Sequence, residues 1–286
     1  MSFLQRIKET KKFNESNFFK FFINKHHVGY IKKSNIKIIN KFPNFFIFYK
    51  NSIFLKKEIN NFQKRTYAIN QVFNFLIKKK IILSKHREYF PVFKSFKSKP
   101  LLKVQRVAGS FFGFQFFGVH LNGFLKKNNK YFMWIGRRSK EGNFPNDLDQ
   151  IAAGGLPYNV SLKKNLIKEC LEEANISKDL VLKSKYQGTV SYRVETRLGL
   201  TRTILFCYCL ELPKEFVPKN NDGEIVNFYL WTIEKILKII QKTRKFKFDC
   251  GLVIILFALN KKIIKNRKIK SLLNINTDLK ILKKIN

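Results

Sequence analysis

The chain has 286 residues, of which 45% are hydrophobic, a share that is typical of a globular protein and excludes a disordered one. It carries 57 Lys and Arg residues against 19 Asp and Glu, so the formal net charge is +38. The basic residues are spread along the whole chain and form no single stripe of the kind that binds nucleic acid. The enriched residues Lys, Asn, Ile and Phe can all be encoded by A and T alone. We therefore interpret the charge as drift in an AT-rich genome.

The four cysteines predict neither a disulfide scaffold nor a zinc finger. They form no C-x-x-C pair, and no histidine stands near them at metal-ligand spacing. This use of cysteine favours a reducing cytoplasm. The best apolar run, 251–259, is about half of the roughly 20 residues that a membrane span needs. The N-terminus has no apolar signal-peptide core, so we expect a cytoplasmic protein without a membrane span.

Residues 1–105 mix short apolar runs with lysines and predict a small α+β domain. The runs at 18–22, 45–49 and 69–77 indicate short strands and helices. No catalytic constellation appears among them. Residues 95–100 are a plausible boundary to the next domain.

Residues 106–262 predict a mixed α/β domain whose element order does not suggest a doubly wound sheet. The aromatic, glycine-punctuated stretch 111–124 predicts strands with tight turns, and Asn128-Asn129 predicts a hairpin turn. A helix is expected over 162–174, with Ser161 as its N-cap. The other expected elements are loops at 139–149 and 213–223, strands at 188–194, 203–211 and 224–231, and helices at 233–241 and 252–262. A basic tail, 263–286, completes the chain.

Three carboxylates in the expected helix are the clearest candidates for chemistry. Glu169 and Glu173 are spaced i and i+4, and Glu169 and Glu172 are spaced i and i+3, so all three can converge on one face. Carboxylates this close repel one another, and together they suit a hard divalent cation such as Mg²⁺. The simpler interpretation is a solvated helix face whose acids pair with surface lysines.

The surrounding residues resemble the Nudix hydrolase signature, G-x5-E-x7-R-E-U-x-E-E-x-G-U, in which U is aliphatic. Counted from Gly154, the three glutamates fall on signature positions. The departures are Val160 for the first glutamate, Lys168 for arginine, Cys170 for an aliphatic residue and Asn175 for glycine. Lysine keeps the charge but loses the two-pronged grip of arginine, and asparagine is the next-best residue for a left-handed backbone.

Further segments resemble one Nudix subfamily, which includes the domain fused to thiamine pyrophosphokinase in some fungi. These segments are 118–124, 134–139, 148–157, 166–170, 188–192 and 216–224. The resemblance covers roughly residues 111–260. It implies an α/β fold, a Nudix α/β/α sandwich with a mixed sheet over 106–262, preceded by the small α+β accessory domain of 1–105.

The resemblance also implies the roles of the site residues. Mg²⁺ or Mn²⁺ would be held by Glu169, Glu172 and Glu173, and catalysis would be carried by Glu172, Glu173 and Glu224. Substrate contacts would come from Gly154, Gly155, Arg137, Arg138, Tyr192 and Glu195. Of the two arginines, at most one would face the substrate, because adjacent strand residues face opposite ways. His120 is interpreted as a packed strand residue, and the cysteines as small apolar core residues.

The implied function is metal-dependent hydrolysis of a small-molecule diphosphate, most specifically thiamine diphosphate or its oxidised analogues to the monophosphate and phosphate. An oxidised nucleoside diphosphate is the alternative substrate. A catalytically inactive, polyanion-binding protein is the alternative from another class, although we expect no specific nucleic-acid partner. The sequence leaves open whether the protein is a monomer or a homodimer.

Overall fold

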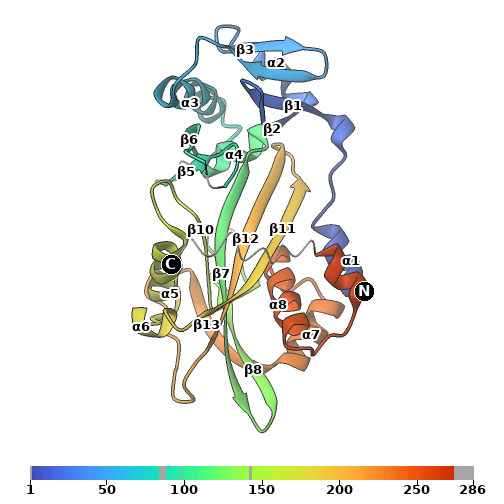
Figure 1. Ribbon diagram of the computed structural model, residues 1–286, viewed down its shortest axis with the longest axis vertical. Helices are drawn as coiled ribbons and strands as arrows, with labels where there is room; N and C mark the ends of the chain where they lie inside the picture. Colours follow the sequence, from blue (N-terminus) through green and yellow to red (C-terminus); the bar gives the residue numbers. More distant parts are fainter. Residues whose placement is uncertain (1, 84–87, 97, 142–143, 274–286) are drawn as a thin grey trace.

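The computed structural model describes residues 2–83, 88–96, 98–141 and 144–273. The described residues form three β-sheets: a small four-stranded sheet from the N-terminal part of the chain, a two-stranded one, and a long, twisted seven-stranded sheet (Figure 1). The order of elements is mixed α and β throughout, as the sequence predicts.

The small sheet has four strands in the order β2-β1-β4-β3, of which β1 and β4 are parallel neighbours. Helix α3 begins at its N-cap Asn61 and buries one apolar face in the same core as Phe21 of β1. A two-stranded ladder of β5 and β6 leads on to the long sheet. The elements are η1 Glu15–Asn17, β1 Phe18–Ile23, β2 His26–Lys32, η2 Lys33–Asn35, α2 Ile36–Ile39, β3 Phe46–Tyr49, β4 Ser52–Leu55, α3 Phe62–Lys78, β5 Tyr89–Val92 and β6 Leu102–Gln105.

Helix α1 (Phe3–Glu9) lies apart from the small sheet, beside the C-terminal helices (Figure 1). Ile7 is fully buried in the core that these helices share with the long sheet. Arg6 donates from Nε to the Ile240 carbonyl at 3.0 Å. The first helix of the chain is therefore packed into the second half of the molecule.

The long sheet has seven strands, with the path β11-β12-β7-β8-β13 and the short strands β10 and β9 paired to β7 and β8. The pair β12–β7 is parallel and the others are antiparallel, so the sheet is mixed. Its strands are β7 Gln115–Lys127, β8 Lys130–Arg138, β9 Leu148–Asp149, β10 Ala152–Gly155, β11 Lys185–Glu195, β12 Leu200–Glu211 and β13 Ile225–Thr232.

Helices cover both faces of the long sheet, which confirms the predicted α/β/α sandwich with its preceding α+β region (Figure 1). Helices α5 (Leu162–Ala174) and α6 (Lys178–Val181) share one core with the sheet. Helices α7 (Ile233–Lys242), α8 (Phe248–Asn260) and α9 (Arg267–Leu272) share another. The rest of the predicted tail, 274–286, lies outside the described residues.

The expectation of strands and tight turns over 111–124 is wrong in part. Residues 111 and 112 end helix α4 (Arg106–Phe112), and Gly113 terminates it with φ of +59°. Gly118 and Gly123 lie inside β7 instead of at turns. A Cβ on Gly118 would come within 2.9 Å of the Gly154 carbonyl oxygen, so this glycine permits the close approach of β10.

The described residues contain no helix that is both long and apolar enough to cross a membrane. All four cysteines are buried and free, in agreement with the prediction that they do not form a disulfide scaffold.

Candidate active site

Helix α5 carries the three candidate glutamates, and its ends are fixed by local sequence. Ser161 is the N-cap, with its Oγ accepting a hydrogen bond from the Lys164 backbone N–H at 3.2 Å. Asn175 ends the helix with φ of +54°, the left-handed conformation expected at this position. Buried Leu166 and Cys170 hold the apolar face against the sheet. The glutamates are therefore set on a capped helix that cannot turn about its axis without losing this core.

Glu173 is the most buried of the three, with 3% of its surface exposed. Its Oε2 accepts a hydrogen bond from the backbone N–H of Ala153 at 2.7 Å. Burial, followed by the nearby charges of Asp149 and Glu169, raises the pKa of Glu173 well above its usual value. A buried, ionised carboxylate in this position would be stabilised by a cation beside it.

Glu169 lies one turn earlier and faces the backbone of β10. A Cβ on Gly154 would come within 2.1 Å of the Glu169 carboxyl carbon, so the glycine makes room for the carboxylate. Burial, together with the charges of Glu172 and Glu224, raises the pKa of Glu169 to about 7 against the opposing charge of Lys168. A nearby cation would therefore stabilise the ionised form of Glu169, as it would that of Glu173.

Glu172 is the outermost of the three and is partly exposed. The Lys168 ammonium lies 3.2 Å from Glu172 and 3.6 Å from Glu169, so it bridges two of the glutamates on the solvent side. The same ammonium also pairs with Glu88 at 3.4 Å. Lysine at this signature position therefore binds carboxylates as a point charge, as its chemistry predicts.

Gly155 is confined by neighbours that leave no room for a side chain. A Cβ there would come within 2.7 Å of the Phe90 ring, which belongs to β5. The Gly155 carbonyl accepts a hydrogen bond from Asn165 Nδ2 at 3.0 Å, which ties the turn to α5. The predicted glycine pair is thus a close-packed backbone segment beside the glutamates.

Glu224 approaches the same region from the loop before β13. Arg138 donates from Nη2 to Glu224 at 3.1 Å and from Nη1 to Asp149 at 3.0 Å. The Glu224 backbone N–H donates to Asp222 Oδ1 at 2.9 Å, which fixes the turn. Since Glu224 contributes to raising the pKa of Glu169, the two carboxylates belong to one electrostatic group.

Comparison with known proteins found relatives that match most of this chain. Residues 2–116 match a family model described as a domain of unknown function, DUF4743. The chain is 39% identical over 243 residues to Nudix hydrolase 24, chloroplastic, of Arabidopsis thaliana, covering 84% of this chain and 67% of that protein. It is 36% identical over 267 residues to Nudix hydrolase 20, chloroplastic, of the same plant, covering 89% and 71%.

The chain belongs to the Nudix hydrolase family. Its members are metal-dependent diphosphate hydrolases, and this protein is therefore an enzyme of that class. Among solved structures, the Deinococcus radiodurans protein DR0079 is 20% identical, with a TM-score of 0.45 over 59% of this chain and 98% of that one.

The two predicted arginines of this Nudix hydrolase have different surroundings. Arg138 is held between Asp149 and Glu224, whereas Arg137 donates to Asn146 Oδ1 at 3.3 Å on the exposed side of the loop. Adjacent residues of β8 thus point in different directions, as the strand geometry predicts. Arg138 is the arginine that the structure places with the acidic group.

Tyr192 and Glu195, predicted to contact substrate, lie on β11. Tyr192 is buried against Phe248 at the start of α8, with ring centroids 4.9 Å apart and nearly perpendicular planes. Glu195 pairs with Lys32 of β2 at 2.8 Å. The structure therefore places Glu195 at the junction with the small sheet instead of beside the glutamates of α5.

Sequence reasoning missed a set of buried polar residues on the α8 face of the sheet. Asp149 and Asp249 are buried there, and the half-buried Lys247 lies 3.7 Å from Asp149 and 3.4 Å from Asp249. Although burial would raise it, the charge of Lys247 and other neighbours lowers the pKa of Asp149 to about 2. The sequence offered one signal, the charged residue Asp149 directly before Gln150 and Ile151, which are buried. It does not show which residues pair with Asp149.

Proposed function

We propose that this Nudix hydrolase cleaves thiamine diphosphate or its oxidised analogues to the monophosphate and phosphate. The observation that supports the hydrolytic site is the pair of buried carboxylates, Glu169 and Glu173, facing the β10 backbone with raised pKa values. The resemblance of segments 188–192 and 216–224 to the thiamine-linked Nudix subfamily supports the choice of substrate.

The donor set fits a hard divalent cation, Mg²⁺ or Mn²⁺. Glu169, Glu172 and Glu173 offer only oxygen ligands, which such ions prefer. The raised pKa values of Glu169 and Glu173 arise from burial and from the charges of neighbouring carboxylates, and a bound cation would offset both effects. When bound, the metal would activate water and neutralise charge on the diphosphate.

The protein's own groups would divide the remaining work. Glu224 would serve as general base, with Arg138 orienting its carboxylate from 3.1 Å. Gly154 would keep room for the Glu169 carboxylate, and Gly155 lies against the Phe90 ring, so both would shape the backbone beside the metal. Arg137 stands on the exposed side of the loop, where it would contact an outer phosphate. Tyr192 packs against Phe248 on the α8 face of the sheet and Glu195 pairs with Lys32 of β2, so neither residue has a part in this proposal.

The test is phosphate release by the purified full-length chain with Mg²⁺. Thiamine diphosphate, its oxidised forms, an oxidised nucleoside diphosphate and a nucleotide sugar would be offered in parallel. Glu173→Gln is the inactive control, and Glu215→Gln, a glutamate in the loop after β12, is the matched variant that should retain activity. Turnover of the thiamine compounds that disappears in Glu173→Gln would support the proposal.

Turnover of the oxidised nucleoside diphosphate alone would replace the substrate assignment and keep the enzyme. If the folded chain instead binds polyanions with steep salt dependence and releases no phosphate, the binding-protein alternative holds. The net charge of +38 makes this control necessary. The cytoplasmic location stays a prediction, since the two plant relatives carry the word chloroplastic in their names.

A further inference from the structure

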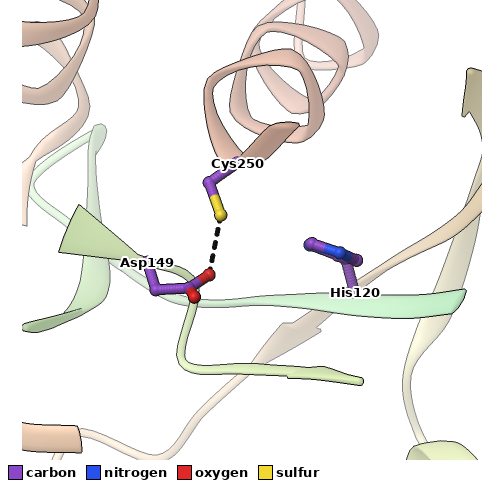
Figure 2. A group of neighbouring side chains, drawn as sticks. All are labelled: His120, Asp149 and Cys250. Carbon is purple, nitrogen blue, oxygen red and sulfur yellow. Dashed lines mark hydrogen bonds between the residues drawn. The ribbon is translucent and has the colours of Figure 1, made fainter. Parts of the chain in front are cut away.

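A second cluster of side chains that can bind a metal, shown in Figure 2, lies where α8 packs on the long sheet, whereas α5 shares a different core with the sheet. His120 comes from β7, Asp149 from β9 and Cys250 from the first turn of α8. All three are buried, and one ligand atom of each lies within 4.8 Å of the other two. The three side chains converge from three separate elements on one small volume.

We propose that His120, Asp149 and Cys250 bind one transition-metal ion, for which zinc is the first choice. Nitrogen and sulfur ligands with a single carboxylate select an ion such as zinc over Mg²⁺. The site is distinct from the all-oxygen glutamate site on α5. It therefore stands independently of the substrate and mechanism proposed above.

The hydrogen bonds around His120 prepare its ring for a metal. Gln150 donates from Nε2 to the Cys250 carbonyl at 2.8 Å, which turns its Oε1 toward His120. His120 Nδ1 lies 2.8 Å from that Oε1 and must be the donor, because an amide oxygen only accepts. Nε2 is then left with its lone pair. Coordination through Nε2 would keep the Gln150 bond, the arrangement that usually orients a metal-bound histidine.

The distances also suit a small ion. The Cys250 Sγ lies 2.7 Å from Asp149 Oδ1, while Arg138 and Lys247 approach the other oxygen, Oδ2. Two ligands of a tetrahedral zinc ion are about 3.5 Å apart, so sulfur and oxygen need to separate by roughly 0.8 Å. Rotation of the two side chains is sufficient for such a change. Asp149 Oδ1, which also accepts the Gln150 backbone N–H at 2.8 Å, would use its other lone pair for the ion, while Oδ2 keeps its ion pairs.

The charges around Asp149 leave an unbalanced negative charge in the metal-free cluster. Arg138 pairs with Asp149 and Glu224, and Lys247 pairs with Asp149 and Asp249. Two cations therefore face three carboxylates. The excess charge lies on Glu224, whose side chain is 52% exposed, at the rim of the cluster.

A divalent ion with a Cys250 thiolate restores the balance. Burial raises the pKa of the Cys250 thiol well above its usual value, so the metal-free residue is protonated and donates to Asp149. Metal binding would release this proton, because the thiolate is the ligand form. The ion adds two positive charges and the thiolate one negative charge, which brings the cluster to neutrality.

A metal here would link α8 to the sheet and help to hold Glu224, through Asp149 and Arg138. Asp149 holds Arg138, and Arg138 in turn holds Glu224. Backbone hydrogen bonds already connect Leu148 with Lys245 and Lys247 on either side of the short bridge to α8. The proposed ion would therefore have a structural role: it would hold α8 against the sheet and position Glu224 indirectly.

The test uses the full chain after removal of metal with a chelator. Zn²⁺ would be titrated against a chromophoric competitor, and Co²⁺ would be added to a second sample. The expected results are one tightly bound zinc per chain and a sulfur-to-cobalt charge-transfer band. Both should disappear in Cys250→Ala and His120→Gln. Both should persist in Cys207→Ala, which removes another fully buried cysteine, and in Glu169→Gln, which alters the α5 site.

The thiolate band separates this site from the glutamates, which cannot produce it. Circular dichroism of each variant would show that a lost band reflects a lost ligand in a folded protein. If metal-free wild-type protein binds no zinc, or if the cobalt spectrum lacks the thiolate band, the proposal is overturned. Loss of phosphate release in Glu173→Gln with an unchanged cobalt band would support the proposal, because the two sites share no ligand.

Discussion

The raised pKa of Glu169 makes the stability of the metal-free protein depend on pH in a definite direction. Glu169 has a pKa of about 7 in the folded chain, compared with 4.5 for an ordinary glutamate. Between these values the folded protein binds more protons than the unfolded chain, so the free energy of unfolding falls as pH rises. The stabilisation is fully present below pH 4.5 and is lost as the pH passes through 7.

The magnitude follows from the shift of about 2.5 pKa units, 7 minus 4.5, in a side chain that is 12% exposed. At about 1.36 kcal/mol per unit, the effect is on the order of 3 kcal/mol. Glu169→Gln removes this titration. Since His27 and His120 have lowered pKa values and act in the opposite direction, only the difference between wild type and variant isolates Glu169.

The assay is urea unfolding of chelator-treated protein at pH values from 4.5 to 7.5. We expect wild type to lose on the order of 3 kcal/mol relative to Glu169→Gln over this range, and Mg²⁺ at the highest pH to restore most of the loss in wild type alone. Parallel stability curves for the two proteins would refute the argument, because they would mean that Glu169 titrates normally in the folded chain.

Three further substitutions test the same site. Gly154→Ala should lower phosphate release by about 100-fold, because the added Cβ would lie 2.1 Å from the Glu169 carboxyl carbon and displace it, and a small misplacement of a catalytic group is costly. The carboxylate is flexible, so little stability should be lost. Steady-state kinetics would measure the rate and a thermal melt the stability. Lys168→Met should raise the pKa of Glu169 further, by about one unit, because it removes a cation 3.6 Å away, and a ¹³C NMR titration of metal-free protein would show no upward change if this is wrong. Ser161→Ala should destabilise the protein by about 1 kcal/mol through loss of the α5 cap, as measured by urea unfolding, while kcat at low temperature stays unchanged.

The parts of the fold that the sequence predicted are those governed by local rules. Ser161 and Asn175 mark the two ends of α5, because one side chain caps the helix and the other accepts a left-handed backbone. The turn Asn128-Asn129 has positive φ at both positions, which suits the tight hairpin between β7 and β8. Each of these features depends on a few neighbouring residues only.

Predictions failed where tertiary packing decided the outcome. The start of α8 was expected at residue 252, but the helix begins at Phe248 and includes Gly251. A Cβ on Gly251 would meet Ile240 at an ordinary 3.6 Å, so this glycine is not required by a turn and gave a misleading boundary. The aromatic residues at 111 and 112 are likewise buried in a helix, where hydrophobic character alone does not distinguish helix from strand.

Within the acidic site, the sequence could predict that the glutamates of α5 lie together, but not which residues hold Glu224. The difference is the distance along the chain between the contacting residues. Glu169, Glu172 and Glu173 lie on one helix, so their spacing alone brings them together. Arg138, by contrast, contacts Asp149 eleven residues later and Glu224 eighty-six residues later, through strand pairings that local sequence does not specify.

One guanidinium thus connects the buried polar cluster on the α8 face with the loop acid beside α5. Arg138 can hold Glu224 in place only while Asp149 holds Arg138, and Asp149 is fixed in turn by hydrogen bonds from Cys250 and the Gln150 backbone. A change at Cys250 can therefore reach Glu224 through two intervening side chains, Asp149 and Arg138, without moving the sheet. We therefore expect the buried residues Asp149 and Cys250, and not the glutamates alone, to set the position of the Glu224 carboxylate.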